Sequence, residues 1–238
     1  MVSKIWFAGR SSSDFGICVE HCPSFRTGSI EYEKITVPGR NGDLIAKGTR
    51  KLLNYTQSYD IWFSGKSKNT MLDAKEIAAW LLFNDGYARL EDTYDPYTYR
   101  MALFSGPLEV ENWMLKRGRA TLAFDCKPQR WLKSGEQPIA VQSGQKIRNN
   151  WQPSLPLIRV SGTGAGTLVV GESTISITGM TGEIIIDSDT QDAYSGTKNL
   201  NNNIVKQGDF PIFKSGDTVV SYSGGITAVE ITPRWWTL

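Results

Sequence analysis

The sequence has little of the residue types on which many enzymes and metal proteins depend. Histidine occurs only once among the 238 residues, at His21. Two-histidine metal sites are therefore excluded, and a reaction that needs an imidazole has no other side chain to use. Cysteine occurs three times, an odd number. Because the N-terminal stretch shows no secretory signal, we expect synthesis in the cytoplasm and reduced thiols.

Long hydrophobic runs and a large net charge are also absent. No apolar run approaches the roughly 18 residues of a membrane-spanning helix, so we expect no membrane partner. Lysine and arginine number 26 and aspartate and glutamate 24, which gives a formal net charge of +2. Proteins that bind the nucleic-acid backbone usually carry a clear basic excess, so we expect no specific nucleic-acid binding. With 40% hydrophobic residues the chain is nevertheless too apolar to be disordered.

What the sequence does contain is a series of short β-strand patterns separated by glycine. The 23 glycines mostly punctuate segments rich in Val, Ile, Thr, Tyr and Trp, which is typical of mainly β proteins. In the first half we predict strands over 5–7, 15–19, 29–37, 50–63, 87–91, 97–104, 108–113 and 120–126. The segment 116–119 is the expected turn between the last two. Pro-Gly and Asn-Gly between 29–37 and 50–63 predict a long β-hairpin.

One α-helix is predicted after this hairpin. Thr70 and Asp73 form a variant capping box at its start, and Gly86 stands where a left-handed C-terminal cap is expected. Its apolar positions cover much of the helix circumference: Ala74, Ile77, Ala78, Trp80, Leu81 and Phe83. We therefore expect this helix to be packed between two layers.

A change in composition near residue 135 predicts two domains, 1–135 and 136–238. Residues 1–135 hold 19 basic and 15 acidic residues, a net +4, and residues 136–238 hold 7 and 9, a net −2. The second part shows strand patterns over 157–160, 167–170, 174–178, 183–187, 218–222 and 227–232, and 138–148 can supply further strands. Glycine-bearing turns between them favour a β-sandwich. The fold class is thus mainly β, with a β-sandwich-like N-terminal domain that carries the helix and the hairpin.

Two glycine-containing motifs resemble nucleotide-binding loops, but both lack a required residue. Ser64-Gly65-Lys66-Ser67 would need a glycine at position 60 to form a phosphate-binding loop, and Asp60 stands there. The run 162–166 would need a third glycine at position 167, which is Thr167. We interpret the first as a polar loop and the second as a glycine-rich β-turn.

Metal binding has two weak candidates. Cys18, His21 and Cys22 form the one metal-like cluster, but in an extended strand the two cysteines stand about 13 Å apart, too far to share an ion. The segment 187–192 resembles the start of a calcium loop, but it lacks the glycine and the final glutamate of that motif. We expect packed thiols, a solvated loop and no metal.

The densest group of acids is Glu91, Asp92 and Asp95, mixed with tyrosines. Such a group is compatible with the carboxylate pair of a glycoside hydrolase or with a sugar-stacking surface. A hairpin with aromatic cross-strand pairs explains it more simply. Because no Ser/His/Asp or Cys/His arrangement stands out, we predict no catalytic residue, no cofactor and no enzyme activity.

A series of motifs along nearly the whole chain resembles the siphophage distal tail proteins. In the N-terminal half these motifs are FAGRSSSDFGI at 7–17, VPGRNGDL at 37–44, Asn54-Tyr55 and Tyr59-Asp60-Ile61. In the C-terminal half they are NWQPSLPLI at 150–158, DSDTQDAY at 187–194, GDFP at 208–211 and ITPRWWTL at 231–238. Their order and spacing together carry the resemblance.

The resemblance implies a structural role in the virion. Distal tail proteins form a homohexameric ring, alone or as two rings back to back, at the end of a long non-contractile phage tail. The ring joins the tail-tube protein to the tail-tip fibre or tail-associated lysin protein, and in some members it holds receptor-binding proteins. The N-terminal domain builds the ring with a belt hairpin, and the C-terminal domain is a galectin-like β-sandwich. About 100 residues in the second domain leave no room for the receptor-binding arm or the carbohydrate-binding module of larger members.

The hairpin tip is the expected subunit contact. Its residues are Pro38, Gly39, Arg40, Asn41, Gly42 and Asp43. A ring needs a head-to-tail interface that closes on itself, and a protruding hairpin supplies one half of such an interface. The alternative is a carbohydrate-binding module for cell-wall glycans, based on the galectin-like resemblance and on four aromatic residues: Tyr94, Tyr97, Trp235 and Trp236. A cell-wall hydrolase is the third reading.

Overall fold

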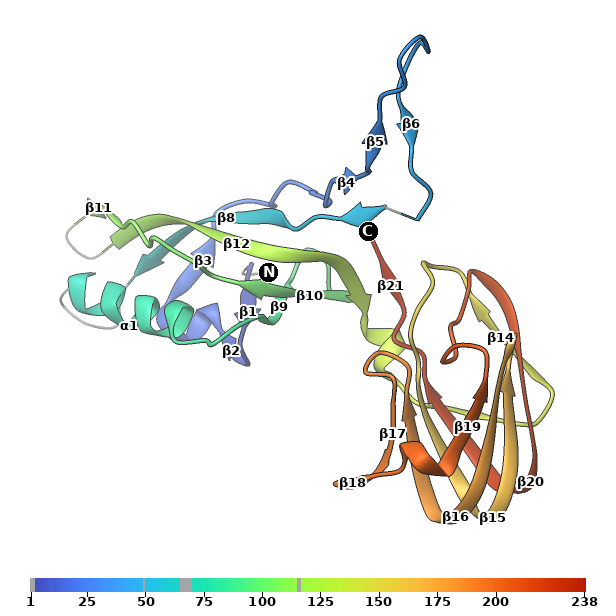
Figure 1. The fold of residues 1–238 in the computed structure, drawn as a ribbon. Coiled ribbons are helices and arrows are strands. Elements are labelled where there is room, and N and C mark those ends of the chain that lie inside the picture. Colours follow the sequence, from blue (N-terminus) through green and yellow to red (C-terminus); the bar gives the residue numbers. More distant parts are fainter. Residues whose placement is uncertain (1–2, 49, 65–69, 115–116) are drawn as a thin grey trace. The chain divides into compact units, whose positions relative to one another are not determined.

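The chain is described here by a computed structural model that covers residues 3–48, 50–64, 70–114 and 117–238, with the side chains of 112–114 left out of the description. It divides into two compact units, Met1–Arg130 with Leu238, and Trp131–Thr237. Both are built mainly from β-strands (Figure 1). Among the described residues no helix is both long and apolar enough to span a membrane.

The first unit is a sheet with one helix and a projecting hairpin. Its sheet strands are β1 (Ile5–Phe7), β2 (Arg10–Ser11), β3 (Ile17–Val19), β8 (Tyr55–Ser64), β9 (Ala88–Asp92), β10 (Thr98–Leu103), β11 (Glu111–Met114) and β12 (Arg117–Leu132). A 3-10 turn, η1 (Ser12–Phe15), joins β2 to β3, and α1 (Thr70–Leu82) follows β8. The strand order is β2-β1-β9-β10-β12-β8-β3, with β11 paired to β12. Most of the predicted strands of this half are thus found near their expected positions, with β12 much longer than expected.

The core of this unit follows from alternation along its long strands. In β8 every second side chain is buried, from Tyr55 to Phe63, and the others face outward. Phe124 of β12 contacts the rings of three other aromatic residues, Phe7, Tyr59 and Phe104. Aromatic side chains bury large areas, so this cluster supplies much of the hydrophobic stabilisation of the unit.

Helix α1 lies with one face on this core. Trp80 stacks on Phe15 at 4.7 Å between ring centroids and donates its indole N–H to the carbonyl of Phe7 at 3.0 Å. The opposite face is exposed and carries four large apolar side chains: Met71, Leu72, Leu82 and Phe83. The expectation of a helix packed between two layers is therefore wrong within one chain, because the sheet covers only one side.

The end of α1 also differs from the expectation. The helix ends at Leu82, and the amide of Asn84 donates from Nδ2 to the carbonyl of Trp80 at 3.1 Å. Gly86 lies four residues beyond the helix with a φ of 141°, outside the left-handed helical region. Asn84, and not Gly86, satisfies a carbonyl at this helix end.

The prediction of a turn at 116–119 is wrong for residues 117–119. Residues 115–116 lie outside the described part of the chain, but Arg117 and Arg119 already belong to β12 and pair with β8. Gly118 is needed for packing and not for a turn, because a Cβ there would stand 2.4 Å from the ring of Phe63. A glycine in a strand often marks such a close approach.

The predicted hairpin exists but is shorter and interrupted. It consists of two short ladders, β4 (Ile30–Glu31) with β7 (Lys51–Leu52) and β5 (Lys34–Ile35) with β6 (Leu44–Ile45). The expected second strand, 50–63, is instead divided. Most of it forms β8, which pairs with β3 and β12 in the main sheet because its alternate side chains enter the core. In Figure 1 the hairpin projects away from that sheet.

The second unit is a β-sandwich made largely from three long strands. These are β15 (Leu157–Val170), β16 (Ser173–Asp187) and β20 (Gly216–Thr232). The shorter elements are η2 (Lys133–Glu136), β13 (Ile139–Val141), β14 (Gln145–Asn149), β17 (Asp192–Ser195), β18 (Lys198–Asn199), η3 (Asn201–Asn203), β19 (Ile204–Gln207) and β21 (Trp236–Thr237). One half of each long strand lies in a layer with the order β13-β20-β15-β16-β17-β18. The other halves form the second layer, in which β14 pairs with β20, β19 pairs with β16, and β15 lies between β20 and β16.

The six short strands predicted here are the halves of these three. The prediction of a turn at the glycine run 162–166 is wrong. These residues form a bend inside β15, where the register shifts against both neighbouring strands. Gly162 lies opposite Gly182 of β16, and Gly166 lies opposite Gly224 of β20. A Cβ on Gly225 would stand 1.9 Å from the carbonyl oxygen of Thr163, so only glycine permits this approach. Glycines in register let all three strands bend together.

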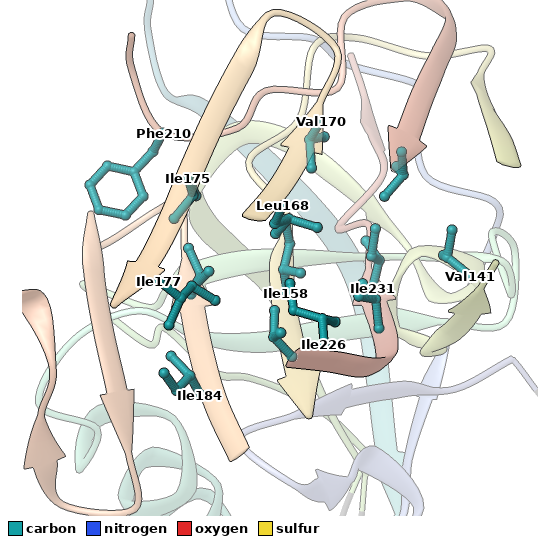
Figure 2. Close-up of a cluster of buried hydrophobic side chains, with 14 of the residues drawn as sticks. Val141, Ile158, Leu168, Val170, Ile175, Ile177, Ile184, Phe210, Ile226 and Ile231 are labelled. Atoms are coloured by element: carbon teal, nitrogen blue, oxygen red, sulfur yellow. The ribbon is translucent and has the colours of Figure 1, made fainter. Parts of the chain in front are cut away.

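The bent strands enclose one hydrophobic core. It contains residues from both halves of each long strand, among them Ile158 and Leu168 of β15 and Ile175 and Ile184 of β16 (Figure 2). Ile226 and Ile231 of β20 are labelled as well, together with Val141, Val170, Ile177 and Phe210 (Figure 2). The sheet thus folds over on itself, and its two inner faces share the same buried side chains.

Candidate functional site

The hairpin of the first unit is the clearest candidate for an interaction site. Almost every residue from 20 to 53 is exposed or half-exposed, and large apolar side chains lie among them: Phe25, Ile30, Tyr32, Ile35 and Ile45. An isolated two-stranded ribbon is at best marginally stable in water, since it has no core of its own. Apolar groups on such a ribbon point to a partner that covers them.

The predicted contact residues, Pro38–Asp43, form the tip of this hairpin. All six are exposed, and Gly39 and Gly42 adopt a φ of 79°. Positive φ at both positions suits glycine and produces the tight reversal. Thr36 donates from Oγ1 to the Asp43 carboxylate at 3.0 Å, so Asp43 also supports the turn. Arg40 has no ion-pair partner among the described residues.

The hairpin carries a small basic excess. Residues 30–52 contain three acids, Glu31, Glu33 and Asp43, and five basic residues, Lys34, Arg40, Lys47, Arg50 and Lys51, a net charge of +2. All five basic side chains are exposed, and within the described ranges none of them forms an ion pair. A projecting surface of this kind favours an acidic partner surface.

Arg130 fixes the base of the hairpin to the sheet. This side chain is 2% exposed; it donates from Nη2 to the carbonyl of Arg26 and lies under the ring of Phe25 at 4.4 Å. Close by, Gln57 donates to the carbonyl of Ser24 at 3.4 Å. The chain therefore leaves the sheet in a defined direction.

A buried polar cluster around Arg100 lies next to Arg130. Arg100 donates to the Asp92 carboxylate at 3.0 Å, and Tyr59 donates to the same oxygen at 2.7 Å. Burial alone would lower the pKa of Arg100, but the neighbouring Tyr59 and Asp92 raise it, so the guanidinium stays charged. Burial, followed by the Asp92 charge, raises the pKa of Tyr59 well above its usual value. Asp95 lies 3.8 Å from both Arg100 and Arg130 and links them.

An acidic groove lies on the outer face of the same unit. It has a volume of about 530 Å³ and is lined by β8, β12 and residues 107–111. Its acidic residues are Glu20, Asp60, Glu109 and Glu111. Glu20 is neutralised by Arg119 through two hydrogen bonds of 2.7 and 3.1 Å, and Asp60 accepts from Thr121 at 2.6 Å. Glu109 and Glu111 have no basic partner among the described residues.

The acids singled out in the sequence serve the fold. Besides Arg100 and Tyr59, Asp92 accepts the backbone N–H groups of Tyr94 and Asp95 at 2.9 and 2.8 Å. Glu91 pairs with Arg89, whose guanidinium lies 3.7 Å over the ring of Tyr99. The cluster belongs to the β9–β10 hairpin, the simpler of the interpretations weighed for it.

The motifs considered for metal, nucleotide and sugar binding do not come together in a site within the described residues. Asp187, at the start of the calcium-like segment, is bound by Arg234 at 2.6 Å. Cys18, Cys22 and Cys126 are free thiols, and no group of His, Cys, Asp and Glu in the described ranges could hold a metal. The motif at 64–67 lies mostly outside the described residues. Of the four aromatic residues considered for sugar binding, Tyr97 is exposed, whereas Trp235 is buried against Phe213.

Sequence reasoning missed the acidic groove. Its residues come from four separate segments, and their convergence depends on the pairing of β3, β8 and β12. The small basic excess of the hairpin, residues 30–52, was visible in the sequence but was not singled out.

Comparison with solved structures identifies the fold. The crystal structure of SPP1 Dit (gp 19.1), described as a paradigm of the hub adsorption apparatus in phages that infect Gram-positive bacteria, superposes with a TM-score of 0.77 over 100% of both chains at 16% identity. The chain has the fold of a phage hub protein. A chain of the phage P2 baseplate in its activated conformation with Ca gives a TM-score of 0.57 at 11% identity, covering 100% of this chain and 99% of that one. The P2 baseplate with Sr gives 0.55 at 12%, with 97% of each chain covered.

Comparisons of the sequence found no match. No protein-family model matches this chain, and no curated protein does either.

Proposed function

We propose that this protein is the structural hub of a long non-contractile phage tail tip. Six copies form a ring that joins the tail tube to the tail-tip fibre or lysin protein, at the distal end of the tail in the virion. The observation that carries this proposal is the match over the full length of both chains to a phage hub protein, combined with the sequence motifs of distal tail proteins. The chain acts as a scaffold and not as an enzyme.

The division of roles follows the two units. The first unit builds the ring, and its hairpin tip, Pro38–Asp43, lies in the contact between neighbouring copies. What supports this role is the exposure of the hairpin and of its apolar side chains, which need a covering partner. The second unit is the galectin-like domain and points outward from the ring. Its sandwich of bent strands supports this assignment.

The mass of the purified chain tests the ring. Six copies of the 26.5 kDa chain give about 159 kDa, which light scattering after size exclusion distinguishes from a monomer. We expect a hexamer, or twice that mass for two rings back to back, and six-fold particles in negative-stain images. A chain that remains a monomer at all concentrations and also fails to form a ring with the tail-tip protein would contradict the proposal.

The hairpin contact is tested separately by variants at its tip. Arg40→Ala with Asp43→Ala should weaken the ring while the monomer keeps its melting temperature, because neither side chain is buried. Thr36→Val is the matched control, since it removes the hydrogen bond to Asp43 and leaves both charges in place. A ring of unchanged stability in the double variant would refute the assignment of the tip to the subunit contact.

A further inference from the structure

The tip of the hairpin contains an asparagine that is followed directly by glycine, Asn41–Gly42, and this dipeptide occurs nowhere else in the chain. Both residues are exposed, and a Cβ on Gly42 would meet no atom within 4 Å, so the space around its backbone is open. The preceding turn is closed, because Arg40 donates its backbone N–H to the carbonyl of Val37 at 3.2 Å. Within the described residues, however, neither the N–H of Gly42 nor the side-chain amide of Asn41 forms a hydrogen bond.

Other asparagines of the chain are held in place. Asn54 donates its side-chain amide to two side chains, and the buried Asn149 donates to two backbone carbonyls. Asn201 donates its amide to the carboxylate of Asp192 at 2.8 Å. None of these three precedes a glycine, so the side chain of the next residue shields its backbone nitrogen. Asn41 therefore differs from them in the freedom of its amide and in the access to the nitrogen that follows it.

This freedom permits a reaction between the two residues. The backbone nitrogen of Gly42 can attack the side-chain amide carbon of Asn41, because the bond between them closes a five-membered ring. As the new N–C bond forms, the bond from that carbon to the side-chain nitrogen breaks, and ammonia leaves with the proton of the Gly42 nitrogen. Water then opens the resulting succinimide at one of its two carbonyls. One opening gives aspartate, and the other gives isoaspartate, in which the backbone runs through the former side chain.

We propose that Asn41–Gly42 is a site of spontaneous modification in the free chain and that assembly protects it. The first part depends on the tip alone, whereas the second rests on the proposed function, in which Pro38–Asp43 lies in the contact between copies. Modification adds one negative charge, which lowers the net charge of residues 30–52 from +2 to +1. Isoaspartate also lengthens the backbone of a tight turn by one carbon. A copy that stays unassembled thus loses its original tip with time and becomes less able to join a ring.

Mass spectrometry of a single peptide tests the site. A lysine-specific protease cuts after Lys34 and Lys47, so residues 35–47 form one peptide with the dipeptide in its interior. When a dilute sample of the free chain is kept at pH 8, this peptide should gain one mass unit as the amide NH2 is replaced by OH. Conversion should be roughly tenfold faster or more than in peptides that contain Asn54 or Asn149, because glycine leaves its nitrogen unshielded. An isoaspartyl methyltransferase should label the isoaspartate product.

Asn41→Gln is the matched control. It keeps an amide at the tip, but the corresponding ring has six members and closes far more slowly, so the peptide should keep its mass. The urea-unfolded chain shows the rate without any constraint from the fold. If the peptide converts in the unfolded chain but stays unchanged in the folded one, the tip holds the two groups apart and the proposal is overturned.

Size exclusion separates rings from free copies and tests the protection. After the same incubation, the peptide from the ring fraction should be converted several-fold less than the peptide from the free fraction. Equal conversion in both fractions would overturn the protection and remove the tip from the subunit contact. If no ring forms, the proposed function fails, while conversion in the free chain still supports the modification site.

Discussion

Arg234 binds the carboxylate of Asp187 in a two-pronged arrangement, from Nη1 to Oδ1 at 2.6 Å and from Nη2 to Oδ2 at 2.9 Å. Arg234 adopts a φ of 55°, in the left-handed region that residues other than glycine rarely occupy. Asp187 is nearly buried and also accepts the backbone N–H of Asp189 at 2.9 Å. This ion pair joins two motifs that lie 47 residues apart.

Loss of this pair should destabilise the second unit. We expect Arg234→Met to lower the free energy of unfolding by about 2–3 kcal/mol, since it leaves a nearly buried carboxylate without its cation. Urea unfolding followed by tryptophan fluorescence measures the change. Arg159→Met removes the exposed Arg159–Glu183 pair and serves as the control, with an expected change below about 0.5 kcal/mol. Equal effects of the two variants would refute the special role of Arg234.

The same pair predicts a dependence on pH. Although burial alone would raise the pKa of Asp187, the hydrogen bonds from Arg234 hold it below its ordinary value of 3.8. Because the pKa is lower in the folded state, the stabilisation is present above pH 3.8 and is lost as the pH falls through the folded pKa. Asp187→Asn should therefore flatten the acid side of a stability-against-pH curve. A curve for this variant that parallels the unaltered protein below pH 4 would contradict the prediction.

The bend of the long strands should depend on single glycines. Gly225→Ala places a Cβ 1.9 Å from the carbonyl oxygen of Thr163 and should cost at least about 2 kcal/mol of stability. Gly179→Ala in β16 is the matched control, because a Cβ there meets no atom within 4 Å. The control should change stability by only a few tenths of a kcal/mol. Thermal unfolding of the two variants compares them directly.

The buried Asp92–Arg100 pair should behave as one unit. Arg100→Met or Asp92→Leu alone should destabilise the first unit by about 3–5 kcal/mol, because each leaves the other charge buried without its nearest opposite charge. The double variant should lose much less than the sum of the two. Denaturant unfolding of all four proteins gives the coupling energy. Additive losses would show that the two charges do not depend on each other.

The three thiols should differ strongly in reactivity. Burial raises the pKa of Cys126 to about 12, and the side chain is inaccessible, whereas Cys22 is exposed. Labelling with a chromogenic disulfide reagent at pH 8 should modify Cys22 rapidly and Cys126 only when the first unit unfolds. The rate at Cys126 then reports opening of that unit. Fast labelling of the Cys22→Ser variant at Cys126 in the folded protein would contradict its burial.

Much of the fold could be predicted because strands alternate and glycines punctuate them. The pattern of β8 was visible in Tyr55, Tyr59 and Phe63, and most strands of the first half lie near their predicted positions. The hairpin tip was likewise visible in its Pro-Gly and Asn-Gly dipeptides. These signals are local, so they need no knowledge of what lies opposite in the fold.

The errors share a physical cause. The sequence alone does not distinguish a glycine that ends a strand from one that lets a strand bend or pack closely. Gly118 and Gly162 were both interpreted as turn residues, and both lie inside strands, where another chain segment occupies the space of a side chain. The acidic groove was missed for a related reason, because Glu20, Asp60 and Glu109 meet only through strand pairing.

The shared strands of the second unit also have a mechanical consequence. In a sandwich of two separate sheets, the layers can slide past each other by shearing side-chain contacts alone. Here β15, β16 and β20 run through both layers, so covalent backbone crosses from one to the other three times. A pulling force on one layer is therefore transmitted along the chain to the other, and the layers separate only when ladders of hydrogen bonds break together. We therefore expect the shared strands, more than the side-chain contacts between the layers, to resist shear of this domain.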